Sequence, residues 1–74
     1  MAKFYKAVTY VQGEIANVTM INKKFMTKKQ IKDKLLQDIN FEASWAGLEV
    51  VDNGDEIKTI EANGDVYATV VISG

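Results

Sequence analysis

The sequence predicts one small α+β domain, a five-stranded, mostly antiparallel sheet with one helix packed on one face. A length of 74 residues leaves room for a single hydrophobic core. Asn-Gly pairs at 53–54 and 63–64, each flanked by β-prone runs, predict hairpins late in the chain. A helix-capping pattern at Thr27 precedes an amphipathic stretch. The predicted order of elements over residues 1–74 is therefore ββαβββ.

The first two predicted strands form a hairpin. Residues 3–11 are rich in aromatic and β-branched side chains, which favour strands. Gln12 and Gly13 follow at once and suit a tight turn. Residues 14–25 then alternate loosely between apolar and polar positions, so we expect them to form the returning strand.

The helix is predicted to begin at Thr27, because Thr27 and Gln30 have the spacing of a capping box. Met26 and Ile31 match the hydrophobic staple that accompanies such a cap. The helix is expected to end between residues 40 and 44, with Gly47 as the alternative end. Its core face is predicted from apolar residues at helical spacing, namely Ile31, Leu35, Leu36 and Ile39.

Three further strands are predicted at residues 48–51, 56–62 and 65–73, connected as a meander. The last of them is apolar on both of its faces, and such a strand at a sheet edge would invite pairing between molecules. It therefore belongs in the middle of the sheet, beside the first strand, which is also apolar on both faces. This gives a predicted strand order of 2-1-5-4-3.

The order of elements resembles the β-grasp arrangement, as in the immunoglobulin-binding domains of streptococcal surface proteins. The resemblance covers most of the chain, but no motif residues carry it and the extra strand departs from it. A resemblance of fold does not assign a function, so no binding residue is transferred to this sequence.

The sequence offers few groups for catalysis. It contains no His and no Cys, which excludes the commonest general base, a thiol nucleophile and the usual ligands of transition metals. Neither serine lies in a Gly-x-Ser-x-Gly motif, and no Gly-x-Gly-x-x-Gly pattern occurs. The acidic cluster at residues 52–56 lacks the spacing of an EF-hand. We therefore predict no enzyme activity, no metal and no cofactor.

Charge is distributed very unevenly along the chain. Residues 1–34 hold eight Lys against Glu14 and Asp33, a formal charge of +6, and residues 35–74 hold Lys58 against eight acids, a formal charge of −7. A basic segment is a candidate patch for nucleic acid or another anion. The absence of Arg and the spread of the lysines around the helix argue against a binding groove. The candidate residues are Lys23, Lys24, Lys28, Lys29, Lys32 and Lys34.

One helix can cover only one face of the sheet, so the other face is a candidate protein interface. If Val66, Ala68, Val70 and Ile72 face the helix, Tyr67 and Val71 point outward. Two residues of the neighbouring first strand are expected to join them, which makes the predicted interface Tyr5, Val11, Tyr67 and Val71.

Trp45, beside Phe41 near the predicted helix end, could serve as a core residue or as an interface anchor, and we favour the core.

These observations predict a small non-enzymatic protein-interaction module, acting as a regulator or inhibitor or by self-association, as in proteins encoded by phages and mobile elements. It would bind a protein partner or a second copy through the open sheet face or an edge strand. The alternative is a nucleic-acid-binding protein that uses the segment from Lys23 to Lys34. No signal peptide and no apolar run of about 20 residues is present, so we expect a cytoplasmic protein without membrane contact.

Overall fold

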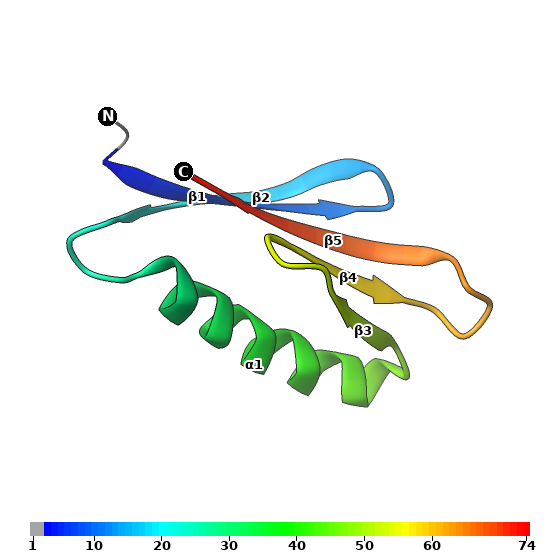
Figure 1. The fold of residues 1–74 in the computed structure, drawn as a ribbon. Coiled ribbons are helices and arrows are strands. Elements are labelled where there is room, and N and C mark those ends of the chain that lie inside the picture. Colours follow the sequence, from blue (N-terminus) through cyan, green and yellow to red (C-terminus); the bar gives the residue numbers. More distant parts are fainter. Residues whose placement is uncertain (1–2) are drawn as a thin grey trace.

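The computed structural model describes residues 3–74 as a five-stranded antiparallel sheet with a single helix against one of its faces (Figure 1). The sheet has the order β2-β1-β5-β4-β3, which confirms both the predicted fold class and the predicted strand order. Along the chain the elements are β1 (Phe4–Val11), β2 (Glu14–Asn22), α1 (Lys28–Ala46), β3 (Glu49–Asp52), β4 (Glu56–Ile60) and β5 (Val66–Ser73).

The helix begins where the capping box predicted. The backbone N–H of Gln30 donates to Thr27 Oγ1 at 3.2 Å, and the N–H of Thr27 donates to Gln30 Oε1 at 2.8 Å. Each side chain therefore satisfies a backbone donor that the first helical turn leaves without a partner.

The predicted helix end between residues 40 and 44 was wrong, and the alternative end at Gly47 is the observed one. Gly47 adopts the left-handed conformation, with φ 70°, and its N–H donates to the carbonyl of Ala43. Ala43 is only 3% exposed, so the added turn contributes to the core.

The tight turn between β1 and β2 is formed by Gln12 and Gly13, which both have positive φ, at 51° and 84°. This is the backbone that a two-residue hairpin loop requires, because its twist matches that of the flanking strands. The two Asn-Gly pairs also fall in hairpins, between β3 and β4 and between β4 and β5, as predicted.

The core lies between α1 and one face of the sheet, which we call the covered face. Strand pairing sets Ala7 opposite Ile72 and Ile57 opposite Val70, and all four are buried. The predicted core face of the helix holds, since Ile31 is buried and Leu35, Leu36 and Ile39 are half-buried.

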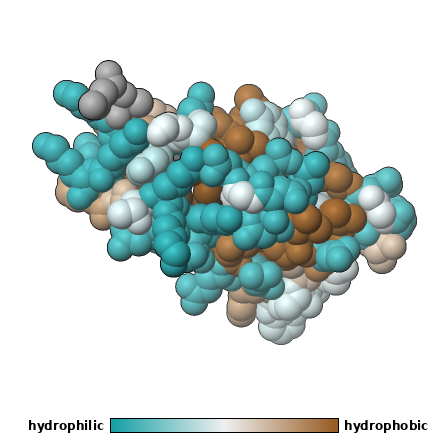
Figure 2. Space-filling view, viewed as in Figure 1, coloured by the Kyte–Doolittle hydropathy of each residue, from teal (hydrophilic) through white to brown (hydrophobic). Residues whose placement is uncertain are grey.

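The helix covers only part of this face. Its main contacts are with β3 and β4, at one side of the sheet, and the β1–β2 hairpin extends away from it (Figure 1). Every residue of β2 from Glu14 to Met20 is exposed. In the same view, hydrophilic residues dominate the surface where α1 begins, and hydrophobic residues gather toward the side that holds the β1–β2 and β4–β5 turns (Figure 2).

We expect Thr27→Ala to lower the free energy of unfolding by about 1 kcal/mol, because the first turn of α1 loses its capping acceptor. Chemical denaturation monitored by circular dichroism measures the change. Thr27→Ser, which keeps the hydroxyl, and Gln37→Ala, at an exposed position of α1, are the controls and should stay close to the wild type. An unchanged stability for Thr27→Ala would mean that the cap does not hold the helix start.

Candidate protein interface

The hydrogen-bond ladder between β1 and β2 determines which backbone groups of β2 are free. The N–H of Lys23 donates to the carbonyl of Lys3 at 3.0 Å. Hydrogen-bonded pairs alternate with non-bonded pairs in an antiparallel ladder. Counting back from Lys23, Ile21, Thr19 and Asn17 therefore direct their backbone N–H and C=O groups toward β1. The residues in between, Val18 and Met20, direct their N–H and C=O groups toward the free edge, whereas the carbonyl of Asn22 accepts a hydrogen bond from the N–H of Phe25 at 3.0 Å.

The same residues carry exposed apolar side chains. Val18 is 47% exposed and Met20 is 56% exposed. Val18 lies opposite Val8 of β1, which in turn lies opposite Val71 of β5, on the sheet face away from the helix. We call this the open face. An apolar row therefore crosses the open face from the centre of the sheet to the free edge of β2, and its exposed part is at that edge, because Val8 is only 8% exposed.

Proteins usually protect an exposed edge strand with proline, lysine or a β-bulge. Between Glu14 and Asn22 the sequence has no proline and no lysine, and its one bulge is at Ala16, near the start of the strand, so residues 17–22 have none of these features. The opposite edge strand, β3, has four residues with an acid at each end, and it contacts α1. The sheet thus has one protected edge and one open edge.

The predicted outward orientation of Tyr5 and Val11 was wrong. Val11 lies opposite Ala68, and Ala7 lies opposite Ile72, so this set of β1 residues is on the covered face. The error arose because both faces of β1 are apolar, and periodicity alone cannot choose between them. Lys6 was the available signal, because it shares the open face with Val8 and indicates contact with solvent.

Of the two predicted interface residues in β5, Val71 lies on the open face, opposite Val8. Tyr67 does not follow the predicted alternation, because it is the extra residue of a bulge where the register shifts. It is 39% exposed and borders hollows on both faces of the sheet. The same bulge turns Val66, which was assigned to the helix side, toward the open face opposite Ile60.

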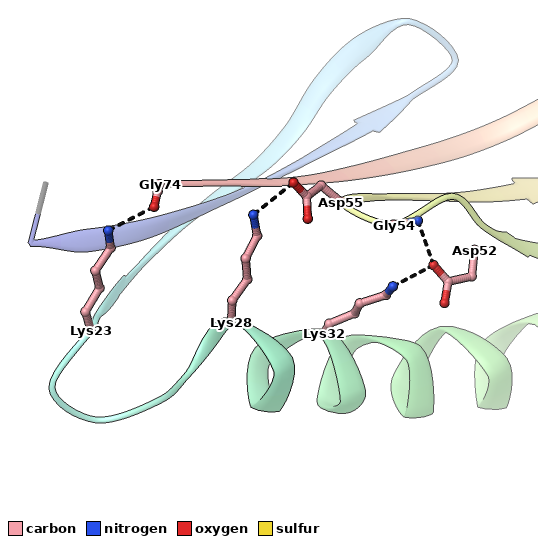
Figure 3. Close-up of polar contacts among 7 residues, drawn as sticks. All are labelled: Lys23, Lys28, Lys32, Asp52, Gly54, Asp55 and Gly74. Carbon is pink, nitrogen blue, oxygen red and sulfur yellow. Dashed lines mark hydrogen bonds and ion pairs between the residues drawn. The ribbon is translucent and has the colours of Figure 1, made fainter.

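Three of the six lysines of the predicted anion patch make polar contacts with the sheet or its turns, Lys28 and Lys32 from α1 and Lys23 from the start of the segment between β2 and α1 (Figure 3). Lys28 Nζ lies 2.9 Å from Asp55 Oδ2, and Lys32 Nζ lies 2.7 Å from Asp52 Oδ1. Lys23 Nζ donates to the carbonyl of Gly74 at 2.9 Å. It also lies 4.8 Å from the centre of the Tyr5 ring, within range of a cation–π contact.

Of the other three lysines of the patch, one is also paired. Lys29 Nζ lies 3.5 Å from Asp33 Oδ2, one helical turn away. Lys24 and Lys34 are the two whose side chains have no ion pair or hydrogen bond within residues 3–74. Three of the six lysines, Lys28, Lys29 and Lys32, are therefore paired with carboxylates of the same chain at its surface.

Asp52 is the carboxylate whose pKa is most clearly changed by its surroundings. The hydrogen bond from Lys32 lowers its pKa, and a second hydrogen bond from the Gly54 N–H at 3.0 Å lowers it further. Lysines in the first turns of a helix are unfavourable toward the helix dipole. Asp55 and Asp52, at the β3–β4 turn, offset this unfavourable interaction because they form ion pairs with Lys28 and Lys32.

A second exposed apolar group lies on the helix. Phe41 is 67% exposed and Trp45 is 78% exposed, with their rings packed edge to face at 6.4 Å between centroids. The assignment of Trp45 to the core was wrong. Both residues are two positions from the buried Ala43, which places them about 200° around the helix and on its outer side.

A hollow of about 230 Å³ lies between the C-terminal half of α1 and the covered face. Its walls are mainly apolar and include Val11, Ile39, Ala43, Leu48, Ile57 and Val70. No buried polar side-chain atom within residues 3–74 lacks a hydrogen-bond partner, so no unpaired polar group is buried there to bind a ligand.

The chain matches no protein-family model, no curated protein and no solved structure. Within residues 3–74 no helix combines the length and the apolar character that crossing a membrane requires. Any assignment of function therefore depends on the surfaces described above.

We expect Asp52→Asn to destabilise the protein at neutral pH, with a loss that shrinks as the pH falls below about 4. A carboxylate with a lowered pKa in the folded state stabilises the fold above its unfolded pKa and loses that effect as it is protonated. Thermal unfolding of both proteins between about pH 3 and pH 7 tests this. Asp38→Asn removes the same charge from an exposed position without an ion pair in residues 3–74. If it behaves identically, the Lys32–Asp52 contact is not the cause.

Proposed function

We propose that this chain is a small non-enzymatic protein-interaction module that binds through the free edge of β2 and the adjoining open face. One observation carries the proposal: Val18 and Met20 present free backbone groups and exposed apolar side chains at the same positions. A partner strand added to β2 would gain main-chain hydrogen bonds, and the apolar row would add buried area and selectivity.

The chemistry of the chain supports binding over catalysis. The sequence has no His or Cys, and several of its acids are held in ion pairs with lysines. A small chain without His or Cys can act by occupying a surface of another protein. We therefore propose a regulator or inhibitor working in the cytoplasm, of the kind encoded by phages and mobile elements.

Nucleic-acid binding through the segment from Lys23 to Lys34 is the alternative. Its support is the concentration of lysines in this segment. Against it stand the intramolecular partners of Lys28 and Lys32, which a phosphate backbone would have to displace. Arg, the side chain best suited to bidentate contact with phosphate and base edges, does not occur in the sequence.

We expect the double change Val18→Lys and Met20→Lys to leave the monomer folded but to abolish partner capture, because it places charge along the apolar edge. The measurement is affinity capture from a lysate of the native host, read by mass spectrometry. The matched control is Phe41→Lys with Trp45→Lys, the same change on the outer side of α1, which should retain the captured protein. If the helix variant loses it and the β2 variant does not, the interface lies on α1 and the proposal is wrong.

We expect no binding to single- or double-stranded oligonucleotides at about 50 mM salt, measured by fluorescence anisotropy. Binding that weakens steeply with added salt would instead favour the nucleic-acid alternative, since lysine contacts release counterions from the phosphate backbone. In that case Lys24→Gln with Lys34→Gln, the two lysines without internal partners, should weaken the binding.

A further inference from the structure

We infer that the occupant of the β2 edge is a second copy of this chain, paired antiparallel through β2 about a twofold axis at Thr19. This inference rests on the proposed function, because it assigns a partner to the same edge. It is carried by three features of β2, namely its backbone pattern, its apolar side chains and the charges at its two ends.

The backbone pattern suits a twofold axis at Thr19. The backbone N–H and C=O groups of Thr19 point toward β1. In a ladder between β2 of the two copies, Thr19 would therefore form a non-bonded pair with Thr19 of the other copy. The residues on either side of Thr19 would then form hydrogen-bonded pairs. Val18 lies opposite Met20 of the second copy, and Met20 lies opposite Val18, with both sets of free N–H and C=O groups in register for hydrogen bonds.

The side chains of this register also match. Val18 and Met20 both lie on the open face, so their pairing joins the two apolar rows across the axis. Each copy thereby covers the side chains that are 47% and 56% exposed in the single chain. Apolar cross-strand neighbours of this kind stabilise an antiparallel pair.

Charge complementarity favours the axis at Thr19 over an axis at Val18. The start of β2 carries Glu14, and just after its end lies Lys24, whose side chain has no ion pair or hydrogen bond within residues 3–74. Antiparallel pairing about Thr19 brings Glu14 of each copy beside Lys24 of the other, twice in the dimer. An axis at Val18 would instead set Met20 opposite the bulged Ala16 and Glu14 opposite Asn22, losing both the apolar match and the charge match.

The assembly would also be closed. A twofold contact uses the same edge of both copies, so no open β2 edge remains. The outer strands of the resulting ten-stranded sheet would be the two copies of β3, each short and acidic at both ends. Such edges resist further addition of strands, so a dimer is expected and not a filament.

Cysteine cross-linking tests the register directly, because the chain contains no Cys of its own. Across a non-bonded pair the Cα atoms lie about 4.5 Å apart, within the range that a disulfide spans. Thr19→Cys should therefore form a covalent dimer with oxidised glutathione, much faster than the exposed control Gln37→Cys. In the same register, Asn17→Cys mixed with Ile21→Cys should cross-link faster than either variant alone.

Sedimentation of the wild type from about 1 µM to about 1 mM should show a monomer that becomes a dimer with rising concentration. Met20→Pro should remain a monomer, because it removes an N–H at the free edge and none from the ladder with β1. If this variant does not fold, the cross-linking rates of the Thr19→Cys and Gln37→Cys variants decide the question.

A wild type that stays monomeric throughout, with Thr19→Cys cross-linking no faster than Gln37→Cys, would overturn the inference. The proposed function is judged separately by the capture assay. A monomer whose capture of another protein depends on Val18 and Met20 would keep the proposed function and refute self-pairing. A monomer whose β2 variant captures the same proteins as the wild type would refute both.

Discussion

A single helix has to cover a five-stranded sheet, and the arrangement of the surface follows from this constraint. A helix of 19 residues is about 28 Å long and 10–12 Å wide with its side chains. Five strands at about 4.8 Å spacing form a sheet that is wider than the roughly 10–12 Å width of the helix. α1 therefore protects the side of the sheet that holds β3 and β4. β2, at the far side, is left without a cover on either face.

Ion pairs as well as apolar packing join the helix to the sheet. Lys28 and Lys32 contact Asp55 and Asp52, which bracket the turn between β3 and β4. These contacts bring the basic first half of the chain against the acidic second half. The charge asymmetry of the sequence thus has a structural use, because the lysines that would repel the start of the helix dipole face acids across the layer.

The two edges of the sheet differ in a way that bears on function. The short acidic strand β3 can remain exposed without inviting association, whereas the nine-residue strand β2 presents apolar side chains and free backbone groups together. A chain of 74 residues can bury only a small core. Under the proposed function, this open edge is the binding surface, and it needs no pocket and no reactive group.

The sequence by itself determined the elements and their order. Thr27 and Gln30 marked the helix start, and the Gln12-Gly13 pair marked the first hairpin, because the residues that signal these features are neighbours in the chain. The strand order followed from the two strands that are apolar on both faces, since neither could lie at an edge. Such inferences need only short segments and one general rule about edges.

Only the tertiary structure decided which residues the faces expose. Tyr5 and Val11 lie on the covered face because of the register between β1 and β5, two segments at opposite ends of the chain. The bulge at Tyr67 and the outward position of Trp45 likewise depend on how distant segments meet. When a strand is apolar on both faces, its sequence pattern does not indicate which face is exposed. The exposed face is determined only when the sheet and the helix pack.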